Sequence, residues 1–126
     1  WNEAIALVQA LPADFAVLSG DDGLTVPFIS CGAVGLVSVT SNVAPAEMKE
    51  LVDAAMSGDG KKALELQKKY YPLMKGLMSL DVNPVPAKAA LALRGQIGWE
   101  IRLPLVPLAE EKHGKLADLL KSFNLL

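Results

Sequence analysis

Two short strand-like segments near the start of this 126-residue chain constrain its fold more than any other feature. Residues 15–18 are continuously apolar, which is typical of a strand buried on both faces of a parallel sheet, and residues 36–40 form a second, Val-rich segment. Residues 24–31 predict a short helix between them, and Gly32 and Gly35 predict a tight turn into the second strand. Strand, helix and strand joined by short turns predict a βαβ unit.

Such a unit is incomplete by itself. Two strands leave unpaired edges, whereas a closed barrel needs about eight βα units and roughly 250 residues. The chain also opens on Trp1 within a helical apolar pattern, Trp1, Ile5 and Val8, over residues 1–11, with no capping residue before it. We therefore expect a fragment of a larger α/β protein.

The residues after the second strand-like segment predict helices. Pro45 opens one at a first-turn position, Gly58 ends it, and Asp59 can cap the next. That next helix, in which Pro72 predicts a kink, carries a packing seam with spacings of three and four. The seam consists of Ala63, Leu66, Tyr70, Leu73, Leu77 and Leu80.

The remaining segments alternate between rigid connectors and helices. Residues 83–86 (NPVP) connect to a short helix that ends near residue 94. Residues 99–108 contain two prolines, which argues against a central strand, and residues 109–123 predict a final helix.

Composition excludes several classes of function. The net charge of −2 gives no excess of positive charge for binding nucleic acid, and the longest apolar runs are far too short to span a membrane. The single cysteine, Cys31, cannot form an internal disulfide. We expect a cytoplasmic protein without a nucleic-acid or membrane partner.

Polar residues follow both strand-like segments, where α/β folds bind ligands. Asp21 and Asp22 could hold a cation or a base, or one of them could simply cap the following helix. Ser41 and Asn42 could hydrogen-bond a small acid or cap the helix after them. The pattern of a calcium loop is absent.

Other reactive side chains lack the partners that catalysis or metal binding needs. Cys31 predicts an inert thiol, and His113 predicts a solvated residue with no further metal ligand nearby. We expect neither a metal nor a cofactor. All ten lysines lie beyond the second strand-like segment, on predicted helices, so none can serve as a buried, imine-forming lysine on a strand.

Four segments, in order, resemble the dihydrodipicolinate synthase family of pyruvate-dependent class I aldolases. They are residues 15–23 (FAVLSGDDG), 32–43 (GAVGLVSVTSNV), 83–88 (NPVPAK) and 102–107 (RLPLVP). The resemblance implies the C-terminal part of an α/β (β/α)₈ TIM barrel. Residues 1–57 would supply the last two strands with their helices, and residues 58–126 an all-helical C-terminal domain.

The resemblance also implies an activity: a lyase of lysine and diaminopimelate biosynthesis that condenses pyruvate with aspartate semialdehyde through a lysine Schiff base. The family's catalytic lysine would precede Trp1, so this chain would contain no catalytic residue. Val37 matches the position whose main-chain carbonyl faces pyruvate, Gly20 lines the pocket and Asp21 lies near its mouth. The remainder of the barrel and a homotetramer are the implied protein partners.

Two alternatives remain open. Another pyruvate aldolase, such as an N-acetylneuraminate lyase or a keto-deoxy-sugar-acid aldolase, would share the pocket wall but accept a different aldehyde. A non-catalytic helical assembly module would use the apolar seam as its principal feature. On the outer helices of the implied barrel, Trp1 and Cys31 are predicted to lie at or near an oligomer interface.

Overall fold

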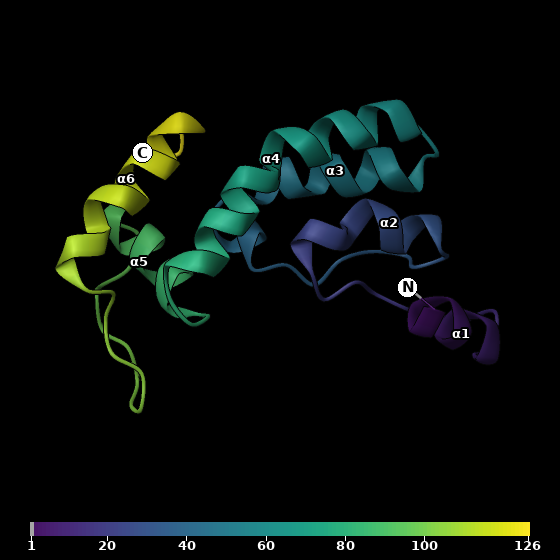
Figure 1. Cartoon of the computed structure of the whole chain (residues 1–126), viewed down its shortest axis with the longest axis horizontal. Coiled ribbons are helices and arrows are strands. Elements are labelled where there is room, and N and C mark those ends of the chain that lie inside the picture. The colour runs from purple at the N-terminus through teal and green to yellow at the C-terminus, as the bar shows by residue number, and fades with distance from the viewer. Residues whose placement is uncertain (1) are drawn as a thin grey trace. The chain divides into compact units, whose positions relative to one another are not determined.

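The computed structural model describes residues 2–126 and is mostly helical (Figure 1). All six predicted helices are present, with ends that shift by a few residues. They are α1 (Asn2–Ala10), α2 (Thr25–Ser30), α3 (Pro45–Met56), α4 (Gly60–Leu80), α5 (Val85–Leu93) and α6 (His113–Ser122). Three short 3₁₀ turns join them: η1 (Asp22–Leu24), η2 (Thr40–Asn42) and η3 (Glu110–Lys112).

The two predicted strands do not form as regular strands within residues 2–126. What remains of the βαβ unit is one isolated parallel bridge between Ser19 and Leu36. Three hydrogen bonds surround it, from Val34 N to Val17 O (2.8 Å), Ser19 N to Gly35 O (2.9 Å) and Val37 N to Ser19 O (2.8 Å). Pairing is therefore parallel, as expected, but it is too short to make a sheet.

The expectation that residues 15–18 are buried on both faces is wrong for this chain, and in the second segment Val37 is exposed as well. Phe15 is 58% exposed, Leu18 48%, Val34 47% and Val37 64%. A strand is buried on both faces only when further strands extend its sheet and helices cover it. Among the described residues no further strand extends this pair, so Phe15, Leu18 and Val37 stay exposed.

The chain divides into two compact units, residues 1–38 with 46–71, and residues 39–45 with 72–126. In the first, α3 and α4 lie side by side and antiparallel (Figure 1), linked by an ion pair between Glu50 and Lys62 at 3.0 Å. Gly58 adopts a positive φ of 80° between them, and Asp59 Oδ1 accepts from Lys62 N at 3.0 Å. The predicted stop and cap are both confirmed.

The second unit has a continuous apolar core. The C-terminal turns of α4 pack with α5 and α6, and Arg94 donates to the carbonyl of Val43 at 2.6 Å. Between α5 and α6 the chain is extended and irregular, as the prolines predicted, and Leu103 there is 85% exposed. The buried core residues are Val43, Ala44, Leu73, Leu77, Leu80, Val85, Ala87, Ala89, Ala90, Leu108, Leu116 and Leu120.

The packing seam predicted for α4 is confirmed, since all six of its residues are buried. The final helix is confirmed as an amphipathic one. Leu116 and Leu120 are fully buried, whereas Leu119 and Phe123 are only partly buried. The division into domains at residue 58 stays a prediction, as does the kink at Pro72. Within residues 2–126, no helix is both long and apolar enough to span a membrane.

Candidate functional site

The candidate site is the loop that follows the first strand-like segment. Ser19 is fully buried, and its hydroxyl donates to the carbonyl of Asp21 at 3.0 Å and accepts from Asp21 N at 3.2 Å. The Asp21 carboxylate accepts from Gly23 N at 2.8 Å and thereby caps η1. Of the two acidic residues, Asp21 is the one with the capping role, a contact that needs no ligand.

Asp22 has a different environment from its neighbour. It is 6% exposed, and its backbone carbonyl accepts from the Thr25 hydroxyl at 2.8 Å. This bond ties η1 to the first turn of α2 and fixes the end of the loop. The loop is therefore held in one conformation by contacts on both sides of Asp21.

Sequence reasoning missed one residue that touches this loop, Gln67 of α4. Its side-chain amide donates to the carbonyls of Asp22 (3.3 Å) and Gly23 (3.2 Å) and accepts from Val26 N at 3.4 Å. Gln67 is only 8% exposed. In the sequence, the sign of this role is that Gln67, a polar residue, stands between Leu66 and Tyr70 of the packing seam. If such an amide is buried with the seam, it needs hydrogen-bond partners from elsewhere in the fold.

The three predicted site residues lie around the single parallel bridge. Val37 N donates to the carbonyl of Ser19, whose bridge partner is Leu36, so Val37 lies beside the residue that precedes Gly20. A Cβ built on Gly20 would contact nothing within 4 Å among the described atoms, so Gly20 borders open space. Gly20, Asp21 and Val37 are all exposed, which places them at an accessible edge of the first unit.

The polar residues after the second strand-like segment form the turn η2. Thr40 is fully buried, and the side-chain amide of Asn42 donates to the carbonyl of Val39 at 3.0 Å. These contacts are structural ones within the second unit. Binding of a small acid by Ser41 or Asn42 stays a prediction.

The lysines have the environments of surface residues. Eight are exposed, while half-buried Lys88 and Lys112 donate to the Glu100 carbonyl and the Asp81 carboxylate, each at 2.7 Å. Interaction with the Tyr70 hydroxyl, strengthened by nearby Glu50, raises the pKa of Lys69 above its ordinary value. An imine-forming lysine needs the opposite, a lowered pKa in a desolvated pocket.

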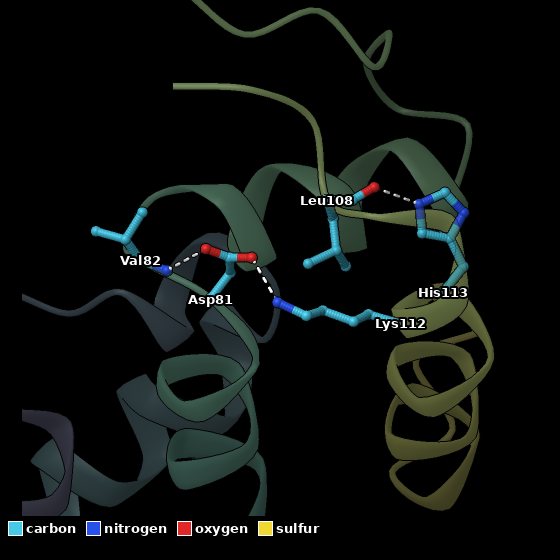
Figure 2. Close-up of polar contacts among 5 residues, drawn as sticks. All are labelled: Asp81, Val82, Leu108, Lys112 and His113. Carbon is cyan, nitrogen blue, oxygen red and sulfur yellow. Dashed lines mark hydrogen bonds and ion pairs between the residues drawn. The ribbon is translucent and has the colours of Figure 1, made fainter. Parts of the chain in front are cut away.

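His113 is not the solvated residue that the sequence suggested. Its ring stacks on Trp99 with centroids 4.4 Å apart, and its Nε2 lies 2.9 Å from the carbonyl oxygen of Leu108 (Figure 2). Because a carbonyl can only accept, Nε2 carries the hydrogen. The prediction failed because Trp99 approaches from a distant, irregular segment. His113 fastens that segment to α6.

An ion pair lies beside this contact. Lys112 donates to Asp81 at 2.7 Å, and the amide of Val82 donates to the same carboxylate at 2.8 Å (Figure 2). The hydrogen bond from Lys112, followed by that from Val82, lowers the pKa of Asp81 from 3.8. Among residues 2–126, no cluster of three or more His, Cys, Asp or Glu residues could hold a metal.

Two further features lie apart from the loop. A shallow hollow of about 570 Å³ lies along α3 and α4, but the charges that line it pair with one another, Lys49 with Asp53 and Lys62 with Glu50. Exposed pairs of this kind contribute little. Cys31 is a half-buried free thiol. The predicted interface with Trp1 stays untested, since Trp1 lies outside the described residues.

With this geometry in place, comparison with known proteins identifies the family. Residues 1–123 match the dihydrodipicolinate synthetase family, and the chain therefore belongs to it. It is 43% identical over 119 residues to 4-hydroxy-tetrahydrodipicolinate synthase of Aquifex aeolicus, covering 94% of this chain and 40% of that protein. Against the corresponding enzyme of Archaeoglobus fulgidus, identity is 43% over 120 residues, 95% of this chain and 41% of the relative.

Solved structures agree with the sequence relatives. The crystal structure of the Aquifex aeolicus dihydrodipicolinate synthase matches 98% of this chain and 42% of its own, with a TM-score of 0.94 and 41% identity. A chloride-inhibited dihydrodipicolinate synthase from Acinetobacter baumannii, complexed with pyruvate, matches 99% of this chain and 43% of its own, with a TM-score of 0.92 and 38% identity. The chain thus spans about 40% of the length of these curated relatives.

Proposed function

We propose that this chain is the C-terminal part of a 4-hydroxy-tetrahydrodipicolinate synthase and supplies one wall of its pyruvate site. In this proposal residues 1–57 provide the last two βα units of a (β/α)₈ barrel, and residues 58–126 the helical domain. The observation that carries it is the parallel bridge between Ser19 and Leu36, which brings Gly20 and Val37 to one accessible edge. Active sites of such barrels lie at the carboxyl ends of the strands; Gly20 follows the bridge residue Ser19 at the end of the first segment, and Val37 is hydrogen-bonded beside it.

The exposed apolar residues of the strand-like segments support the same proposal. Phe15, Leu18, Val34 and Val37 would become buried if further strands extended the pair and closed a barrel around it. The coverage of about 40% of the relatives' length leaves enough chain for those strands. The remainder of the barrel is accordingly the first partner that we propose, and a homotetramer of complete barrels the second.

The proposed chemistry is carried by a lysine outside this chain. Its neutral amine attacks the ketone of pyruvate, and loss of water gives an imine that tautomerises to an enamine. The enamine carbon then bonds to the aldehyde carbon of aspartate semialdehyde, whose oxygen takes a proton and becomes a hydroxyl. The amino group of that substrate adds to the imine carbon, which closes the ring and releases the lysine as its free amine. None of the ten lysines here replaces it, because all lie on helices or beside them at the surface or in structural contacts.

The residues of this chain would bind and orient pyruvate. The main-chain carbonyl of Val37 would face the bound acid, and Gly20 would allow it a close approach, since no described atom occupies the space beside its Cα. Asp21 would stand near the mouth of the pocket with its carboxylate fixed by Gly23 N. All relatives quoted above carry the synthase name, which favours aspartate semialdehyde over the aldehydes of other pyruvate aldolases.

Borohydride trapping with pyruvate tests the proposal directly. Reduction fixes an imine as a stable secondary amine, which intact mass spectrometry detects. We expect an adduct on the full-length parent and none on residues 1–126 alone. A stoichiometric adduct on this chain, or no adduct on the parent, would refute the proposal that the imine-forming lysine of the parent lies outside this chain.

A substitution at Gly20 tests the pocket wall. Gly20→Ala meets no described atom, so it should leave stability nearly unchanged while raising the parent's KM for pyruvate. Gly114→Ala is the matched control, because a Cβ there also meets nothing within 4 Å but lies on α6. Equal KM values for the two variants would remove Gly20 from the pocket.

A further inference from the structure

The loop that carries Gly20 and Asp21 is held by two kinds of contact. Those around Ser19, Asp21 and Thr25 are local and join residues two or three positions apart. The contacts of Gln67 are long-range, since it reaches the loop and the start of α2 across 41 to 45 residues of sequence. Local bonds define the shape of the loop, whereas the bonds from Gln67 fix where that shape is placed.

These bonds of Gln67 use both ends of its amide. The Nε2 group donates to the carbonyls of Asp22 and Gly23, and Oε1 accepts from Val26 N. Gln67 is only 8% exposed, so water has little access to replace these hydrogen bonds if they are lost. Gln67 therefore joins η1 and α2 to α4 at one point, directly after the residues assigned to the pocket wall.

We propose that Gln67 is a positioning residue for the pyruvate site. It holds the Asp22–Gly23 backbone, and through it the neighbouring Gly20 and Asp21, in the position that pyruvate binding requires. The inference rests on the proposed function, because Gln67 can position the pyruvate site only if Gly20 and Asp21 belong to that site. Ordering a binding loop in advance raises affinity by removing the entropy cost of ordering it on binding.

The effect should appear in pyruvate binding more than in turnover. Gln67→Leu keeps the apolar part of the side chain and removes the bonds to Asp22, Gly23 and Val26. We expect the KM for pyruvate in the full-length parent to rise roughly five- to tenfold, the factor that corresponds to about one net hydrogen bond of ordering. At saturating pyruvate, kcat should change less than about twofold, because the reacting lysine is not on this loop.

A second substitution separates the loss of the Gln67 amide donor from a change in side-chain packing. Gln67→Glu preserves size and an acceptor for Val26 N but turns an anionic oxygen toward the carbonyls of Asp22 and Gly23. We expect it to raise the KM for pyruvate at least as much as Gln67→Leu does. It also keeps the test decisive if Gln67→Leu fails to fold.

Ala63→Gly serves as the matched control. Ala63 is fully buried in α4, one helical turn before Gln67, and glycine there weakens the helix without touching the loop. Elevated KM for pyruvate in both Gln67 variants, with a normal value in Ala63→Gly, would support the positioning role. An unchanged KM in the Gln67 variants, or an equal rise in Ala63→Gly, would overturn it.

The two proposals fail in different ways. A wild-type parent that forms no pyruvate adduct refutes the proposed function and this inference with it. A parent that traps pyruvate normally, while Gln67→Leu and Gln67→Glu bind it as tightly as wild type, refutes the inference alone.

Discussion

Gly76, near the C-terminal end of α4, offers a sharp test of how the second unit is packed. A Cβ built there would lie 2.4 Å from Cδ2 and 3.1 Å from Cδ1 of Leu119 in α6. Real Cβ atoms do not approach other carbons so closely, so Gly76→Ala must displace the Leu119 side chain. Glycine at this position is thus explained by the approach of α6 and not by backbone conformation.

Two opposing effects set the size of the change. Alanine stabilises a helix interior by about 1 kcal/mol relative to glycine. Forcing an extra methyl group into a packed contact costs about 1–3 kcal/mol. We therefore expect Gly76→Ala to lower the free energy of unfolding by up to about 2 kcal/mol. Leu119 is only partly buried and can give way, which favours the lower part of that range.

A double-mutant cycle separates the two effects. In a Leu119→Ala background the overlap disappears, so Gly76→Ala should become stabilising by about 1 kcal/mol through helix propensity alone. The sign of the Gly76→Ala effect should therefore reverse, with a coupling energy of about 1–3 kcal/mol. Urea unfolding of the four proteins, followed by far-ultraviolet circular dichroism, measures it. The packing argument is refuted if Gly76→Ala has the same effect in both backgrounds.

The polar contacts of the second unit yield two further predictions. His113→Ala in a Trp1→Phe background should alter the fluorescence of Trp99 and destabilise the unit by about 1–3 kcal/mol, the sum of a ring stack and a hydrogen bond; unchanged emission would contradict the stack. Lys112 lowers the pKa of Asp81, so the stabilisation from this carboxylate is present above its unfolded pKa and is lost as pH falls through the folded value. The urea midpoints of wild type and Asp81→Asn should therefore converge below about pH 4, and a gap that is constant down to pH 2.5 would count against the ion pair.

The helices could be predicted because their signals are local. Pro45, Gly58 and Asp59 mark helix ends through the conformation and hydrogen bonding of nearby backbone alone, and the seam of α4 repeats within one segment. The strands could not be predicted in this way. Apolar runs indicate which residues favour a sheet, but a ladder needs neighbours, and the described residues supply only the single pairing of Ser19 with Leu36.

At the candidate site, too, only the features with local signals could be predicted. An aspartate before a short helix predicts a cap, and Asp21 provides it. The roles of Gln67 and His113 depend on Asp22 and Trp99, which lie 45 and 14 residues away, and no spacing rule connects such positions. Burial of a polar side chain is the feature that would reveal them, and it follows from tertiary packing.

The exposed strand-like segments have a consequence for the fate of this chain in a cell. Phe15, Leu18 and Val37 present apolar surface beside a single bridge, which is the kind of segment that chaperones hold and proteases cleave. The helical core does not protect them, because they lie outside it. The lifetime of the isolated chain would accordingly be set by how quickly these segments are covered, and much less by how firmly its helices are packed.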